Sequence, residues 1–151
     1  MNTLVLILTA VSLFLNIAAW IAARKQMIRS DAALFVSFLI PVCFSAFAVR
    51  YVQNAYPLDL SGAAILKFCA SLATVLYALN GYLNHRSRFS MIIVIAIIFG
   101  LIADVCINLN FVIGGAAFAI GHLLYDFAFV MKQRPRRESA STHMRQYCFQ
   151  P

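Results

Sequence analysis

Five long apolar runs follow one another along the chain, and short polar stretches separate them. Each run holds about 20 residues, which an α-helix needs to cross about 30 Å of hydrocarbon at about 1.5 Å per residue. Repeated runs of this length match a bilayer better than the core of a soluble protein. The pattern predicts an all-α, polytopic transmembrane helical bundle with spans at residues 3–22, 32–52, 62–83, 90–110 and 111–131.

The last two runs are separated by almost no polar sequence. Asn108 and Asn110 fall at their junction. Asparagine tolerates the left-handed backbone that ends a helix, and its side chain can bond nearby backbone groups. We therefore expect a tight helical hairpin at this point.

Composition supports a membrane protein and indicates how it begins. The chain is 63% hydrophobic and 11% charged, whereas soluble domains are about 25% charged. No basic residue precedes the first run, and Arg24 and Lys25 follow it. This order is typical of a retained helix with its N-terminus outside, rather than of a cleaved signal peptide.

Basic residues outnumber acidic ones, 12 against five, for a net charge of +7. Such an excess fits nucleic-acid binding, anionic lipid or membrane topology. The positions favour topology: with the N-terminus outside, the outer loops receive only Arg50, and the inner side receives Arg24, Lys25, Arg29, Arg86, Arg88, Lys132, Arg134, Arg136, Arg137 and Arg145. We expect a multi-pass protein of a cell membrane, such as the bacterial inner membrane, with a cytoplasmic C-terminus and no nucleic-acid partner.

Residues 132–151 change abruptly to polar, basic, proline-containing sequence, KQRPRRESASTHMRQYCFQP. This segment buries too little apolar surface to offset the entropy of ordering it. We expect a disordered cytoplasmic tail. Its basic cluster either binds anionic lipid or, more simply, fixes the topology.

Polar residues inside the apolar runs are the candidate functional groups. A charge near the bilayer centre is costly, so each is expected to face the bundle interior and have a partner. From the helical rise, Lys67 and Asp104 lie about 8 and 9 Å from the same membrane face, so they can meet. Asn108, one turn beyond Asp104, can bond either the carboxylate or a ligand head group. A purely structural Lys67–Asp104 pair, or a Lys67 that extends to the interface, fits the same positions.

The fifth run carries a stripe of residues at helical spacing, namely Gly115, Phe118, His122, Tyr125 and Phe129, with Asp126 at its edge. His122 falls near mid-membrane, where it suits a hydrogen-bond donor, a proton carrier or an orienting group. A satisfied helix-to-helix hydrogen bond is the plainer alternative. Asp126 either fixes the tautomer of His122 or lies at the interface beside Lys132, and we expect the interface.

Other kinds of site find little support. Zinc takes three or four protein ligands, and the apolar runs offer one histidine with scattered carboxylates. A nucleophilic triad and a phosphate-binding glycine loop are not apparent either. Cys43, Cys69 and Cys106 read as small hydrophobic residues. We expect neither a metal nor another cofactor.

Taken in order, these residues resemble the lysoplasmalogenase-like (YhhN) family of integral membrane proteins. The resemblance covers about residues 62–130 and rests on Lys67, Asp104, Ile107, Phe111, Gly114 or Gly115, Phe118, His122, Tyr125 and Phe129. Two positions depart from the usual pattern, since Ala103 stands where a glycine is usual and Phe68 where a proline is usual. The resemblance implies a bundle of about eight helices, of which this chain holds five. The resemblance also implies a second catalytic carboxylate in the later helices. We therefore expect this chain alone to hold half a site, unless Asp126 substitutes for that carboxylate or a second copy or another chain completes the site.

The implied activity is hydrolysis of the vinyl ether bond of lysoplasmalogens, which makes the protein an enzyme of lipid metabolism with a lysophospholipid substrate. Asp104 matches a catalytic carboxylate of the family. We expect His122 and Lys67 to orient groups or stabilise charge at the catalytic site, and Asn108, Tyr125 and Phe118 to bind substrate.

Two alternatives remain. One is a non-catalytic membrane protein, either a degenerate paralogue or a small subunit that packs with lipids or other proteins. The other is a transporter fragment, for which Pro41 alone is a slight indication.

Overall fold

The computed structural model describes residues 3–28, 30–56 and 60–147, with side chains as far as Lys132. The described residues form five helices, α1 (Thr3–Arg24), α2 (Asp31–Ala55), α3 (Leu60–Asn84), α4 (Arg88–Leu109) and α5 (Phe111–Tyr147). All five are long and apolar enough to cross a membrane, α5 through its part Phe111–Lys132. The predicted all-α bundle of five spans is confirmed, because each apolar run of bilayer length forms one helix.

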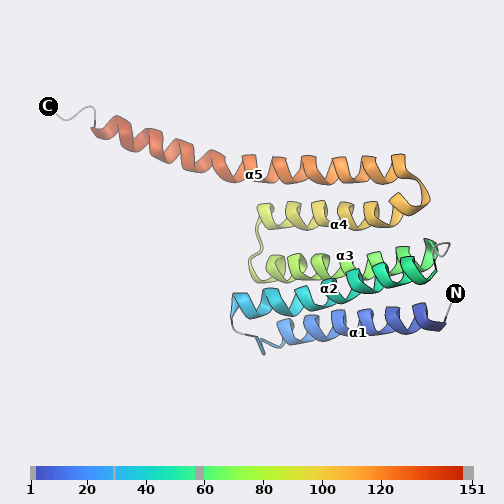
Figure 1. Cartoon of the computed structure of the whole chain (residues 1–151). Coiled ribbons are helices and arrows are strands. Elements are labelled where there is room, and N and C mark those ends of the chain that lie inside the picture. Colours follow the sequence, from blue (N-terminus) through green and yellow to red (C-terminus); the bar gives the residue numbers. More distant parts are fainter. Residues whose placement is uncertain (1–2, 29, 57–59, 148–151) are drawn as a thin grey trace.

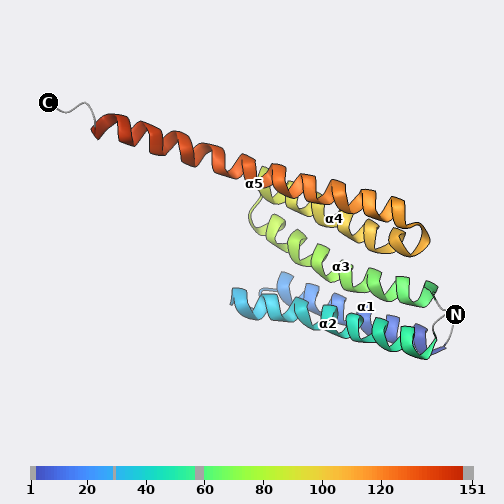
Figure 2. The same ribbon diagram turned by 45° about the horizontal axis from the view of Figure 1, so that its top comes forward.

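The helices lie side by side, and consecutive helices are antiparallel, as Figures 1 and 2 show. Helices α1, α2 and α3 pack against one another in a group of three, α4 packs on α3, and α5 packs on α4. Helix α5 therefore lies at the edge of the described bundle. This position leaves one side of α5 without a helical neighbour.

Polar side chains buried between α1, α2 and α3 bond to one another. Ser45 Oγ donates to Ser12 Oγ at 3.1 Å. The Asn16 amide donates to the carbonyl of Ser12 at 2.9 Å and to that of Cys69 at 3.1 Å. Hydrocarbon offers no hydrogen-bond partner, so such internal bonds fix these three helices together.

The α4–α5 junction is the tight hairpin that the sequence predicts. Asn110 alone separates the two helices, and its Oδ1 accepts from the backbone N–H groups of Val112 at 3.0 Å and Ile113 at 3.2 Å. The left-handed backbone that asparagine tolerates is not used at Asn110, which has extended backbone angles, φ −152° and ψ 112°. The side chain instead caps the first turn of α5, and the backbone N–H of Asn110 donates to the carbonyl of Cys106 at the end of α4, at 2.7 Å.

Helix α5 packs on α4 through small residues. A Cβ atom added to Gly114 would lie 2.6 Å from the Cα of Ile107, and one added to Gly121 would lie 3.1 Å from the carbonyl oxygen of Ala96. Ala117 and Ala128 are also buried. Small residues let two helix backbones approach closely in a membrane. The lack of side chains at these glycines thus sets the distance between α4 and α5.

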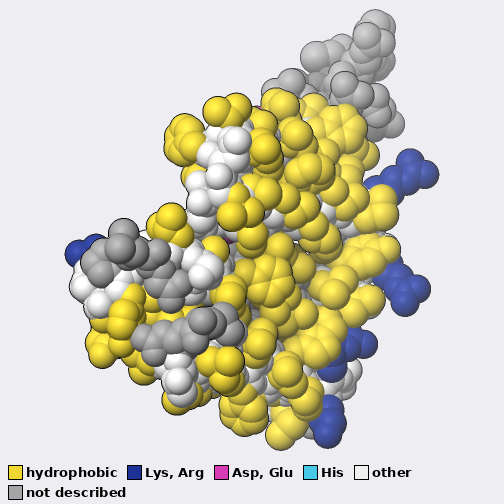
Figure 3. Space-filling view, turned by 90° about the vertical axis from the view of Figure 1, so that its right-hand side faces the viewer, with side chains coloured by type: hydrophobic (Ala, Val, Ile, Leu, Met, Phe, Trp, Pro, Cys, Tyr) yellow, Lys and Arg dark blue, Asp and Glu magenta, His cyan; other side chains and the backbone are white. Residues whose placement is uncertain are grey.

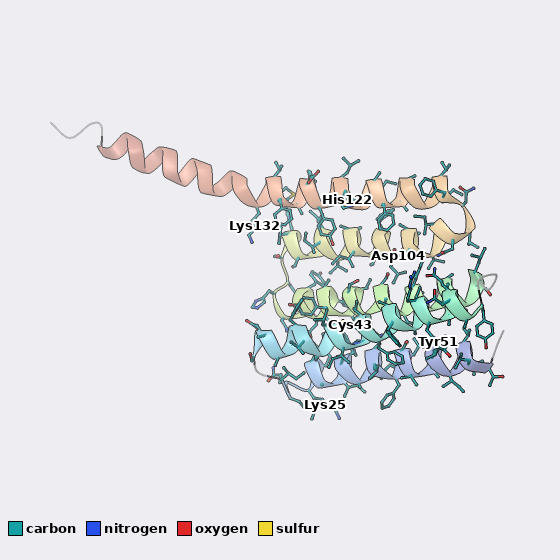
Figure 4. The ribbon with its side chains drawn as sticks, in the orientation of Figure 1. Lys25, Cys43, Tyr51, Asp104, His122 and Lys132 are labelled. Atoms are coloured by element: carbon teal, nitrogen blue, oxygen red, sulfur yellow. The ribbon has the colours of Figure 1, made fainter. Side chains whose placement is uncertain are left out.

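Most described basic side chains outside the core gather at one end of the bundle, which we call the basic end. Arg24 and Lys25 follow α1, Arg86 and Arg88 lie where α3 gives way to α4, and Lys132 ends the membrane-length part of α5. Figure 4 shows Lys25 and Lys132 at this same end. Large apolar side chains such as Phe14, Phe47 and Phe127 are exposed along the helices, and apolar side chains also dominate the opposite end, which Figure 3 faces. This distribution suits helices that stand upright in a bilayer.

Helix α5 continues to Tyr147, past the point at which the sequence predicts a disordered tail. The side chains of residues 133–151 lie outside the described ones, as does Arg29. The expected cytoplasmic location and lipid contacts of this segment stay predictions.

We predict that Gly114→Ala destabilises the α4–α5 hairpin by about 1–3 kcal/mol, because the added methyl group would overlap the backbone of Ile107. Gly115→Ala is the matched control, since a Cβ at Gly115 meets nothing within 4 Å. Thermal or chemical unfolding of both variants in detergent measures the difference. Equal stability of the two variants would contradict the close packing at Gly114.

Candidate functional site

A cavity of about 280 Å³ lies between α3, α4 and α5. Its polar lining consists of Ser71, Thr74, Asp104, His122 and Tyr125, and apolar or small residues line the rest. Gly100 and Gly121 contribute to the space because neither has a side chain. We call it the Asp104 cavity, after the acidic residue in its wall.

Asp104 is half-buried on α4 and is bonded to α3. Ser71 Oγ donates a hydrogen bond to Asp104 Oδ2. Figure 4 places Asp104 on the side of α4 that faces α3. Sequence reasoning missed Ser71, although it lies one helical turn after Lys67 and therefore on the same face of α3. That spacing is the signal that would have found it.

Lys67 and Asp104 were expected to meet, and the structure corrects this expectation. Lys67 Nζ donates to Asn108 Oδ1 at 3.0 Å. The Asn108 amide in turn donates to the backbone carbonyl of Asp104 at 2.8 Å, not to its carboxylate. No Lys67–Asp104 ion pair occurs among the described side chains. Lys67 and Asn108 therefore adjoin the Asp104 cavity without lining it, on its side nearer the α4–α5 turn.

Helix α5 contributes three of the predicted site residues, Phe118, His122 and Tyr125, to the cavity wall. The rings of His122 and Tyr125 have centroids 6.4 Å apart and are tilted by 45°. The stripe to which they belong is not the buried face of α5: Gly115, His122 and Phe129 are exposed, whereas Gly114 and Gly121 face α4. The stripe therefore lies at the edge of the α4–α5 interface, and its residues Phe118, His122 and Tyr125 line the cavity from the α5 side.

Asp126 is exposed and does not line the cavity. Lys132, the expected neighbour of Asp126, instead places Nζ 4.7 Å from the centre of the Phe89 ring. Among the described residues, Asp104 is the one carboxylate in the cavity wall.

The model of the YhhN family matches residues 62–145, which is more than half of the chain. The chain belongs to the YhhN family. No curated protein and no solved structure shows significant similarity to it. The matched region contains every residue that lines the Asp104 cavity, together with Lys67 and Asn108. The part of the chain that carries the family pattern is thus the part that builds the cavity.

This YhhN-family cavity combines groups that can transfer and position a proton. The Asp104 carboxyl group, bonded by the Ser71 hydroxyl group, lines the same cavity as the His122 imidazole and the Tyr125 phenol. Among the described side chains, no group of three or more histidine, cysteine or acidic residues is placed to hold a metal ion. The carboxyl, imidazole and phenol groups of the cavity wall are of the kinds that take part in general acid–base catalysis.

A double-mutant cycle tests the Lys67–Asn108 contact. We predict that Lys67→Met and Asn108→Leu have a coupling energy of about 1 kcal/mol, the scale of a hydrogen bond between membrane helices. Lys67→Met and Asn110→Ala are the control pair, which should be additive within about 0.5 kcal/mol. Unfolding free energies in detergent give both values. Equal coupling in the two cycles would contradict the contact.

Proposed function

We propose that the protein is a membrane hydrolase that cleaves the vinyl ether bond of lysoplasmalogens to a fatty aldehyde and a glycerophospho head-group product. The observation that carries the proposal is Asp104, a half-buried carboxyl group that Ser71 holds at the wall of a cavity within membrane-length helices. Membership of the YhhN family supports it.

The chemistry of a vinyl ether suits a single acid at such a place. Asp104 in its protonated form gives a proton to the vinyl carbon farther from the ether oxygen, and the vinyl carbon attached to that oxygen becomes an oxocarbenium ion. Water then adds to that carbon and returns a proton to the Asp104 carboxylate. The resulting hemiacetal separates into the aldehyde and the free glycerol hydroxyl group. In this proposal Ser71 positions the carboxyl group, and His122 orients the attacking water.

The remaining candidate residues bind the substrate. The Lys67 ammonium group has three donors, and its described hydrogen bond to Asn108 uses one of them. The others are available to a phosphate group on the turn side of Asp104, where Asn108 also lies. Phe118 and Tyr125 form an aromatic wall beside the substrate.

The orientation in the membrane belongs to the proposal as well. The positive-inside rule assigns the basic end, and with it the tail, to the cytoplasm. Lys67 and Asn108 then lie towards the outer leaflet. The bacterial inner membrane is the location that we propose.

Aldehyde release from a lysoplasmalogen by the purified protein in detergent tests the proposal. We predict that Asp104→Asn lowers kcat/KM by about 10²–10⁴-fold, because an amide cannot give the proton. Asp126→Asn is the matched control, an identical change at an exposed residue outside the cavity, and should retain activity. Equal rates for wild type and Asp104→Asn would remove the mechanism.

A non-catalytic membrane protein is the second candidate. It is favoured by the single carboxylate in the described cavity wall, because the family resemblance leads us to expect a second one. On this alternative the wild type releases no aldehyde, and Asp104→Asn alters stability or assembly alone. A second copy or another chain that supplies the missing carboxylate would show itself as activity that depends on assembly.

A further inference from the structure

A second cavity, of about 180 Å³, lies between α2, α3 and α4. We call it the aromatic cavity. It is almost wholly apolar and is lined by Phe35, Phe38, Leu39, Val42, Ala73, Thr74, Tyr77 and Ile97. The mechanism proposed above makes no use of it.

Three aromatic rings give this cavity firm walls. The Tyr77 ring packs edge-on against Phe35, with centroids 6.0 Å apart, and against Phe38, with centroids 5.6 Å apart. Phe38 is only 3% exposed and so is fixed by its surroundings. Such edge-to-face contacts hold aromatic side chains in defined positions. The cavity is therefore a built feature of the helix group.

The aromatic cavity continues the Asp104 cavity. Thr74 and Ile97 line both of them. Each cavity alone is smaller than the roughly 300–1,000 Å³ of most small-molecule sites. One molecule of ordinary ligand size would therefore occupy both.

The order of side chains along α3 indicates which kind of molecule the two cavities would bind. Lys67, Ser71, Thr74 and Tyr77 recur at spacings of three and four and share one helical face. Along about 15 Å of helix this face passes from an ammonium group, through the partner of Asp104 and a hydroxyl group, to aromatic rings. The polarity falls steadily in one direction, as it does along a lipid with one chain.

We infer that the aromatic cavity holds the hydrocarbon chain of a single-chain lipid, whose head-group linkage lies in the Asp104 cavity and whose phosphate group faces Lys67. The inference rests on the proposed function, because it names how that substrate is held. The small volume of the aromatic cavity suits one chain rather than two. The chain runs towards the basic end, and the head group lies towards the α4–α5 turn.

The test uses 1-O-alkyl lysophospholipids, whose saturated ether cannot be cleaved, in a series of chain lengths. Their binding to the purified full chain in detergent is measured by calorimetry. Leu39→Trp fills the aromatic cavity, and Ile40→Trp is the matched control on the next residue of α2, outside the cavity. The two parent side chains are comparably exposed, 41% and 54%.

Wild type and Ile40→Trp should bind longer chains more tightly. Leu39→Trp should bind the longest chains roughly tenfold more weakly, the loss of about two buried methylene groups, and should gain nothing from added length. Equal affinities in all three proteins, or an equal loss in both variants, would overturn the inference.

A label on the wild type keeps the test independent of any folding defect in Leu39→Trp. The same lipid, with a photoreactive diazirine near the methyl end of its chain, should label α2 and α3 around Phe35 and Tyr77. Labelling spread over lipid-facing residues such as Phe14 would overturn the inference.

The two proposals can fail separately. Selective loss of binding in Leu39→Trp without aldehyde release from any lysoplasmalogen would remove the hydrolase and leave the lipid site. Aldehyde release with unchanged binding in Leu39→Trp would remove the chain site alone.

Discussion

A bilayer has no water with which to bond a polar group, so each polar side chain in the five helices needs a partner inside the protein or in a ligand. The Ser12–Asn16–Ser45 group meets this need by joining α1, α2 and α3, and the Lys67–Asn108 and Ser71–Asp104 contacts meet it by joining α3 to α4. The oxygen atoms of the Asn16 and Asn80 side chains are exceptions, buried without a partner among the described residues. The Asp104 cavity lies beside one of these contacts, because Ser71 and Asp104 both line it, and His122 and Tyr125 line it from α5.

Among the described side chains, close packing at small residues rather than hydrogen bonding positions α5 on α4. Gly114 and Gly121 bring its backbone onto α4, so that Phe118, His122 and Tyr125 reach the cavity that Asp104 enters from α4. Two different interactions therefore build the site: polar contacts set α4 on α3, and small residues set α5 on α4. A change at either glycine would alter the cavity without touching any group that could react.

The length of an apolar run predicts a spanning helix reliably, because hydrocarbon thickness fixes it, and the five spans and the hairpin were predictable for this reason. Helix rotation was not. In a soluble protein polar residues mark the outer face of a helix, but lipid is as apolar as the protein core. The sequence therefore did not show whether α5 packs on α4 through the side that carries His122 or through the side that carries Gly114. The similar depths of Lys67 and Asp104 in the membrane suggested that the two side chains meet. The rotation of α3 and α4 about their axes instead pairs Lys67 with Asn108. Ser71 escaped notice because a hydroxyl group in an apolar run is ordinary.

The decrease in polarity along α3 matters for the proposed lipid ligand because a bilayer already orients a lipid before it binds. A single-chain lipid in a bilayer already lies with its head group at the surface and its chain towards the centre. A site whose ammonium group is near the surface and whose aromatic rings are deeper accepts that molecule in the direction it already has, so little orientation has to be lost on entry. The same gradient would place the bond next to the head group at the depth of Asp104. On the proposed function, reaction at that bond would follow from where the lipid lies, and selectivity for one chain would follow from the narrow space beyond Thr74 and Ile97.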